Sequence, residues 1–273
     1  MQLDFKGIIS SFVGQNHSMH HPYVNTAITA VRAASKTIIQ YFDRLDRLKL
    51  TENSNHTFRS EADVQAEDII VHAIKAAYPY HTVLTATSGA EEAAGSTSRW
   101  MIDSLNGVDN FIHGIPHFCI SISVEIQGKI EHSVILDPLR QELFVASRGR
   151  GAYLNNKRLR VARTQHLEKS MLAMHVPHAR DSALYPAYLK IFGACLAACA
   201  HTRHTGSAAL DLAYVAAGRF DGCWAHGLPY WQSAAGTLLI AEAGGFVSDF
   251  NGGDRYVDSG NIVTATPKIF KRL

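Results

Sequence analysis

The residues best suited to chemistry follow a predicted strand over residues 100–102. Asp103 ends this strand, and Asn106-Gly107 then marks a tight turn. A carboxylate at the carboxyl edge of a strand lies where ligand sites often form in layered α/β folds. The same pattern also suits an aspartate that only caps a turn. Asp103 alone therefore does not establish a site.

Two further segments place small or polar residues at the start of a predicted helix. Gly206-Ser207 precedes a helix over 207–217, and Trp231-Gln232 opens a helix over 231–243. The free backbone N–H groups of a helix N-terminus can hold an anion. Ordinary N-caps have the same composition, so each segment on its own leaves both interpretations open.

The elements that would position these residues divide the chain into two halves. Apolar residues at helical spacing predict helices over 23–48 and 60–77, with Ser60 as a cap. Alternation with a period of two predicts strands, which lie near 83–84, 100–103, 118–126, 133–135 and 143–146. Later strands alternate with the two helices above; they lie at 171–175, 222–225, 246–248 and 261–264. We expect an α+β half (19–150) and an α/β half (151–273), after an N-terminal extension (1–18).

Composition limits the possible classes of protein. The chain has 273 residues, 47% of them hydrophobic, with 26 basic and 24 acidic side chains. This balance argues against a disordered chain and against a histone-like protein. No segment has the length and apolar character of a membrane span, and we expect a cytoplasmic protein. Cys195 and Cys199, one helical turn apart, fit buried thiols better than a metal or redox pair.

Several longer segments, taken in order, resemble the inositol monophosphatase family, and within it the bacterial SuhB-like branch of extragenic suppressor proteins. They are PHF at 116–118, DPLRQELFVASRGRGAYLN at 137–155, HTGSAALDLAYVAAGRFDG at 204–222 and AEAGGFVSDFNGG at 241–253. The resemblance runs from about Met19 to the end of the chain. It implies an αβαβα layered sandwich of the α/β class, a homodimer, and Mg²⁺-dependent hydrolysis of inositol 1-phosphate or a similar sugar phosphate. SuhB-like proteins are also associated with transcription antitermination through NusA and RNA polymerase.

The carboxylates that the family uses to bind Mg²⁺ are largely replaced. The family has an acidic pair after an early strand, the motif D-P-[LI]-D-G-T, and W-D at a helix start. The acidic pair falls on Ala86 and Thr87, the second motif aspartate on Asn106, and the W-D aspartate on Gln232. The motif threonine, which orients the attacking water, falls on Val108.

The remaining family roles are carried over by position. Of the family's metal-binding carboxylates, Asp103 remains. Asp63 remains from the pair that activates the water, and it lies on a predicted helix. The acidic residue that usually contacts a substrate hydroxyl falls on Ala225. The amides of Gly107 and Val108 would hold phosphate. Three residues would line the substrate pocket; they are Gly206, Ser207 and Ala208.

These losses bear directly on metal binding. Mg²⁺ exchanges its water only for several oxygen ligands, chiefly carboxylates and phosphate. At about 2 kcal/mol for each lost charge, three losses weaken binding more than roughly ten-thousand-fold. Asp109, Glu91 or Glu92 would rescue the site if a loop shifted. Without metal, nothing lowers the pKa of the attacking water.

Two other features of the composition leave alternatives open. The histidine pairs His113/His117 and His201/His204 have spacings that can bind zinc, although no acidic or thiol partner is adjacent. Seven basic residues between Arg140 and Arg163 face one acid, Glu142, which fits a solvated hairpin or an RNA contact.

The sequence therefore predicts a SuhB-like protein that is a weak or inactive phosphatase, with Mg²⁺ weakly bound or absent, and that acts by binding a partner. The alternative is a working Mg²⁺-dependent phosphomonoester hydrolase that uses Asp63, Asp103 and a rescuing carboxylate.

Overall fold

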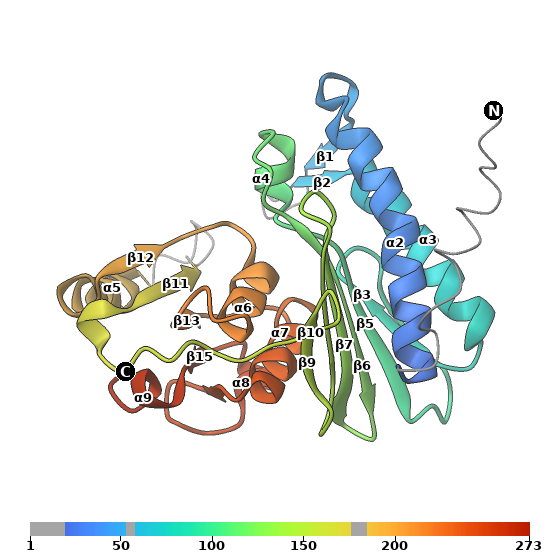
Figure 1. Ribbon diagram of the computed structural model, residues 1–273. Coiled ribbons are helices and arrows are strands. Elements are labelled where there is room, and N and C mark those ends of the chain that lie inside the picture. Colours follow the sequence, from blue (N-terminus) through green and yellow to red (C-terminus); the bar gives the residue numbers. More distant parts are fainter. Residues whose placement is uncertain (1–19, 53–57, 176–184) are drawn as a thin grey trace, which may run out of the picture.

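The computed structural model describes residues 20–52, 58–175 and 185–273, so the predicted extension over 1–18 lies outside the described residues. The elements form five layers: two helices, an eight-stranded sheet, two helices, a five-stranded sheet and an outer helix (Figure 1). The αβαβα sandwich expected from the resemblance is confirmed.

The first layer consists of α2 (Pro22–Phe42) and α3 (Glu61–Ala77), which cover one face of the large sheet. The Ser60 hydroxyl accepts a hydrogen bond from the backbone N–H of Asp63 at 3.1 Å, as its predicted role as a cap requires. The helix predicted over 23–48 ends at Phe42 and is followed by a 3₁₀ turn, η1 (Leu45–Arg47). Leu45 and Leu48 still pack against the core, so the apolar spacing continues past the true end of the helix.

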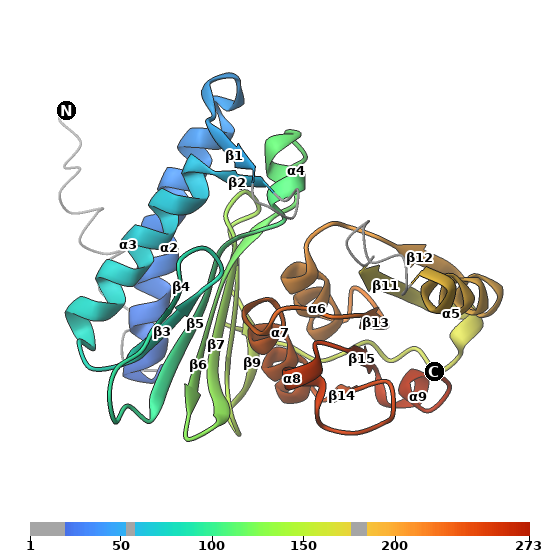
Figure 2. The same cartoon turned by 180° about the vertical axis from the view of Figure 1, so that it is seen from behind.

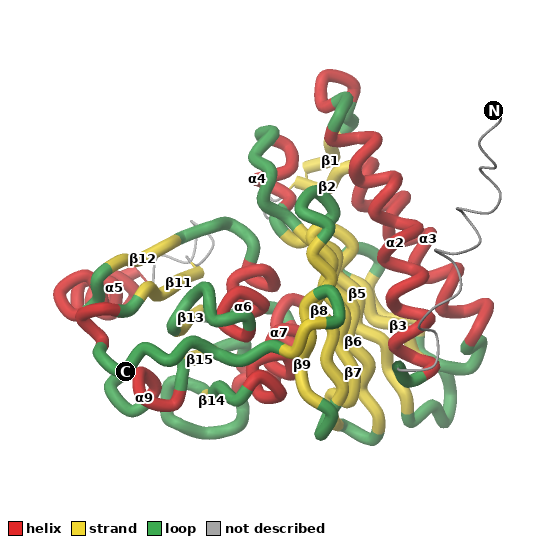
Figure 3. The backbone as a smooth tube through the Cα atoms, in the orientation of Figure 1, coloured by secondary structure: helices red, strands yellow, loops and turns green. Residues whose placement is uncertain are grey.

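The large sheet has one parallel pair, β3–β5, among otherwise antiparallel neighbours of the described chain. Its spatial order is β10 (Lys157–Arg158), β9 (Gly151–Leu154), β8 (Glu142–Ser147), β7 (Lys129–Asp137), β6 (Cys119–Ile126), β5 (Ser98–Asn106), β3 (Thr82–Thr85) and β4 (Gly89–Glu91). The strands predicted over 133–135 and 143–146 are present as parts of β7 and β8, which pair antiparallel. The sheet continues to Arg158, several residues past the expected boundary at 150, and a loop then crosses to the second sheet (Figure 3).

The central layer consists of α6 (Ala208–Ala216) and α7 (Tyr230–Ala243), which lie between the two sheets (Figure 2). Small residues allow the two helices to approach closely. A Cβ atom added to Gly236 would lie 2.3 Å from the Cβ of Leu212. Gly244 ends α7 with a φ of 89°, in the left-handed region that favours glycine.

The second sheet combines parallel and antiparallel pairs. Its order is β12 (His201–Arg203), β11 (Met171–His175), β13 (Gly222–Ala225), β15 (Ile262–Ala265) and β14 (Phe246–Ser248), with the first three strands parallel. The outer helix α5 (Tyr185–Ala198) packs on this sheet through Tyr188 and Cys195.

The short elements are η2 (Leu167–Lys169), β1 (Leu50–Glu52), β2 (Phe58–Ser60), α4 (Val108–Ile112), α8 (Tyr256–Ser259) and α9 (Pro267–Phe270). Among the described helices, none is both long enough and apolar enough to cross a membrane.

Candidate functional site

The segments singled out in the sequence converge on one cavity of about 210 Å³. It lies where β5 ends, at the N-termini of α4, α6 and α7. Its walls are formed by Phe58, Leu105, Asn106, Gly107, Val108, Asp109, His175, Gly206, Ala208 and Gln232. Ser207 and Ala225, also expected near this site, are fully buried and are not part of the cavity wall.

Asn106 connects the end of β5 with the N-terminus of α6. Its side-chain amide Nδ2 donates a hydrogen bond to Asp103 Oδ2 at 2.8 Å. Its Oδ1 accepts one from the Ser207 hydroxyl at 2.7 Å and one from the Ala209 backbone N–H at 3.0 Å. The side chain is 3% exposed. The resemblance places a metal-binding aspartate at this position, whereas here the oxygen accepts two hydrogen bonds and the nitrogen faces the neighbouring carboxylate.

The two remaining family carboxylates lie beneath the cavity. Asp103 and Asp63 are 3% and 7% exposed, and neither forms part of the cavity wall. The Ser104 hydroxyl donates a hydrogen bond to Asp63 Oδ1 at 2.5 Å. Burial raises the pKa of Asp63 to about 6, against the lowering effect of this bond. Burial also raises the pKa of Asp103 to about 7, although the hydrogen bond from Asn106 opposes the shift.

A third buried carboxylate, Glu67, was not among the residues expected from the sequence. It is 2% exposed, and its Oε2 accepts a hydrogen bond from the backbone N–H of Thr87 at 3.1 Å. The Thr87 hydroxyl in turn lies 3.5 Å from Asp63 Oδ2. Ala86, next to it, contributes only its backbone N–H, which donates to Ile102. Helical spacing could have indicated Glu67 in the sequence, because it follows Asp63 by four residues and therefore lies on the same inward face of the helix.

Of the three carboxylates considered as substitutes, the structure brings only Asp109 to the cavity. Glu91 forms an ion pair with Lys75 at 2.8 Å. Glu92 accepts a hydrogen bond from the Thr82 hydroxyl at 3.3 Å. Both residues belong to the β3–β4 edge of the sheet or its following loop. A rescue by Glu91 or Glu92 does not fit this arrangement.

His175 and Phe58 line the cavity but were also missed. His175 ends β11, so its position at a strand's carboxyl end was the usable signal. Phe58 lies in β2, and nothing in the local pattern indicated that this hairpin reaches the cavity.

Two residues of the basic run between Arg140 and Arg163 lie at opposite ends of one hairpin. Arg140 follows β7 and forms an ion pair with Asp137 at 2.7 Å. Arg148 lies at the opposite end of the β7–β8 hairpin and forms an ion pair with Glu131 at 3.2 Å. The antiparallel register separates residues that are close in sequence.

The wall of the cavity offers one carboxylate, from Asp109, together with side-chain amides from Asn106 and Gln232. Within residues 20–52, 58–175 and 185–273, no three histidine, cysteine, aspartate or glutamate side chains gather as a metal-binding group. The arrangement can therefore offer hydrogen bonds from amides and helix N-termini more readily than a set of anionic ligands.

Comparisons with known proteins agree with the fold and the motifs. A model described as the inositol monophosphatase family matches residues 19–273. The Nus factor SuhB of Pseudomonas aeruginosa is 44% identical over 256 residues, covering 92% of this chain and 94% of that protein. The Nus factor SuhB of Escherichia coli K12 is 43% identical over 253 residues, covering 93% and 94%.

Solved structures give the same result. The extragenic suppressor protein suhB from Bartonella henselae superposes with a TM-score of 0.89 at 36% identity, covering 92% of this chain and 96% of that one. An inositol monophosphatase from Anabaena (Nostoc) sp. PCC 7120 gives a TM-score of 0.82 at 31% identity, covering 92% of each chain. The chain belongs to the inositol monophosphatase family.

Proposed function

We propose that this protein is a SuhB-like factor that acts by binding the transcription antitermination machinery and has little or no phosphatase activity. The observation that carries the proposal is the position of Asn106, whose amide nitrogen donates to Asp103 while its oxygen is held by Ser207 and Ala209. A carboxylate at position 106 could accept a cation there, but this amide presents a donor to the one remaining ligand.

The chemistry of the available ligands supports the same proposal. Mg²⁺ needs several anionic oxygens, and the cavity wall supplies only the carboxylate of Asp109. Asp103 is buried beneath this wall, and its Oδ2 already accepts a hydrogen bond from the Asn106 amide. In this proposal these residues carry out no metal-dependent step.

The names of the relatives suggest the class of partner. Both curated relatives are described as Nus factors. We propose NusA or RNA polymerase as the partner, and a cytoplasmic homodimer as the form that binds it. Purified protein should bind NusA or the polymerase saturably, and an Asp103→Asn variant should bind as well as the unchanged chain. Absence of binding to both would reject this part of the proposal.

A phosphatase assay tests the catalytic part. With inositol 1-phosphate and millimolar Mg²⁺, we expect turnover far below about one per second, the lower end of ordinary enzyme rates. A rate near that value, abolished by Asp103→Ala, would reject the proposal.

The second candidate is a working Mg²⁺-dependent phosphomonoesterase. It is favoured by one observation: Asp109 lines the same cavity as Asn106 and Gln232, next to the amides of Gly107 and Val108. In this case Asp109→Asn would lower turnover strongly, and calorimetry would detect tight Mg²⁺ binding that the same variant removes. If both results are negative, the first proposal stands.

A further inference from the structure

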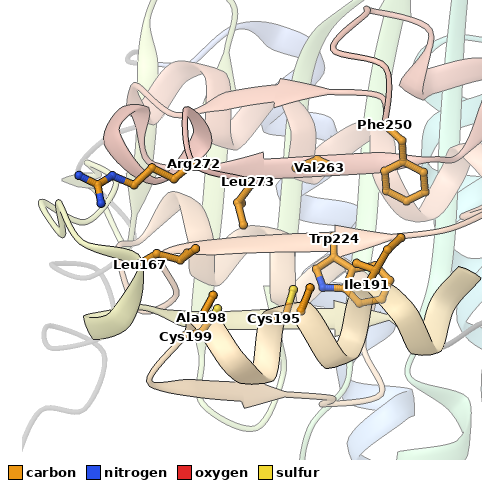
Figure 4. A pocket seen from close by; sticks show the side chains of 11 residues that line it. Leu167, Ile191, Cys195, Ala198, Cys199, Trp224, Phe250, Val263, Arg272 and Leu273 are labelled. Carbon is orange, nitrogen blue, oxygen red and sulfur yellow. The ribbon is translucent and has the colours of Figure 1, made fainter.

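A second cavity, of about 360 Å³, lies between α5, the outer face of the five-stranded sheet and the residues that follow α9 (Figure 4). No residue lines both this cavity and the one around Asn106. Its size falls in the range of pockets that hold small organic molecules. We call it the outer pocket.

The wall of the outer pocket is almost entirely apolar. Trp224 and Val263 come from the sheet, Ile191 from α5, and Leu273 from the end of the chain (Figure 4). Cys195 adds a thiol, and burial raises its pKa, so the group is neutral at ordinary pH. Away from Arg272, no side chain of this wall would compensate the charge of a deeply buried ionic group.

Several large apolar side chains of this wall remain open to water. Ile191 and Phe250 are each 38% exposed, and Leu273 is 48% exposed. Apolar surface gathered around a concave pocket marks a binding site more often than apolar residues scattered singly. A bound hydrocarbon tail would remove part of this surface from water, which is favourable.

Basic side chains lie at the edge of the pocket. Arg272 is the single residue with a charged side chain that lines it. Lys268 and Lys271 are exposed on the same short segment, residues 267–273, which carries no acidic side chain. Within the described residues none of these three side chains forms an ion pair.

We propose that the outer pocket binds a single-chain amphiphile with an anionic head, such as a medium-chain fatty acid, with its tail between α5 and the sheet and its head at Arg272. The apolar wall accommodates the tail, and the cationic segment complements the head. This site is separate from the cavity around Asn106 and does not depend on the function proposed for it.

Calorimetric titration with monomeric octanoate tests the proposal, with 1-octanol as the uncharged probe of equal tail length. We expect one saturable site for octanoate, and a change in Trp224 fluorescence that is absent in Trp224→Phe. Ala198→Phe fills the pocket and should weaken the binding of both probes more than ten-fold. Ala197→Phe, on the exposed side of the same helix, should leave both affinities unchanged.

The contribution of the head is tested separately. Arg272→Gln should weaken octanoate binding by roughly two- to five-fold, the range expected for a partly exposed ion pair, and leave octanol unaffected. An octanoate affinity that is the same in the Ala198→Phe and Ala197→Phe variants would overturn the proposal, as would the absence of saturable binding. Binding to anionic phosphatidylglycerol vesicles without binding to octanoate would also overturn it, in favour of a lipid surface.

Discussion

At the scale of single residues, Asn106 is the side chain of the cavity wall with the most hydrogen bonds described above. Its amide fits between Asp103 and the start of α6, where it donates one hydrogen bond and accepts two. A buried polar group with all of these partners stabilises the local structure, and removing one partner leaves the others unpaired. Asn106 is therefore a structural link between the two halves of the chain.

Changing Asn106 to Asp should lower the stability of the metal-free protein and raise its affinity for Mg²⁺. The new carboxylate would face Asp103 without a donor between them, so we expect unfolding to become easier by roughly 1–3 kcal/mol without metal. Millimolar Mg²⁺ should then raise the melting temperature of Asn106→Asp more than that of the unchanged chain. Asn251→Asp, at an exposed position, is the control. Equal Mg²⁺ responses in all three proteins would count against the role given to Asn106.

His132 provides a prediction for the effect of pH. Burial, with a smaller effect of neighbouring His21, lowers its pKa to about 4 from the ordinary value of 6.5. Between about pH 6.5 and pH 4, His132 is therefore protonated in the unfolded chain and neutral in the folded chain. The stabilising contribution of neutral His132 is complete above pH 6.5, and it is lost as the pH falls toward 4.

The raised pKa values of Asp63, Asp103 and Asp211 act in the opposite direction over part of this range. The measurement is therefore a difference: the free energy of unfolding of the unchanged chain minus that of His132→Gln, followed from pH 7 to pH 4. We expect this difference to fall as the pH falls. A difference that stays constant would show that His132 keeps its ordinary pKa in the fold.

At the scale of elements, the contact between α6 and α7 depends on the absence of a side chain at Gly236. Gly236→Ala would place a methyl group against Leu212, and we expect it to destabilise the fold by about 1–3 kcal/mol. Gly193→Ala is the matched control, since Gly193 also lies inside a helix but has no atom near its would-be Cβ. That change should stabilise the protein by about 0.5–1 kcal/mol. Denaturant unfolding of both variants measures the contrast.

Periodicity predicted most elements of this fold, because α2, α3 and the antiparallel strands each bury one face. It did not predict α5, whose exposed face is as apolar as its buried one and therefore shows little contrast. In the site, family motifs pointed to the cavity around Asn106. They could not reveal the inward face of Glu67 or the position of His175, which depend on how separate elements meet.

At the scale of the whole molecule, the two sheets share one hydrophobic cluster through the central helices. One hydrophobic cluster includes Met101 and Phe144 of the large sheet together with Ala173 and Cys223 of the small one. α7, although it belongs to the second half of the chain, packs on five strands of the first sheet. The two halves of the chain, 19–150 and 151–273, therefore share this central cluster, although each half also has a buried cluster of its own.

We expect the molecule to unfold in a single cooperative transition, because neither sheet can expose its face toward α6 and α7 without disrupting the other. Tryptophan fluorescence can follow the two sheets separately in a Trp231→Phe background. Trp100 reports on the large sheet once Trp224 is changed to Phe, and Trp224 reports on the small sheet once Trp100 is changed to Phe. After correction for the stability change of each substitution, the two denaturant midpoints should coincide, and Gly236→Ala should shift both by the same amount. Two separate midpoints, with only one moved by Gly236→Ala, would mean that the halves are independent domains.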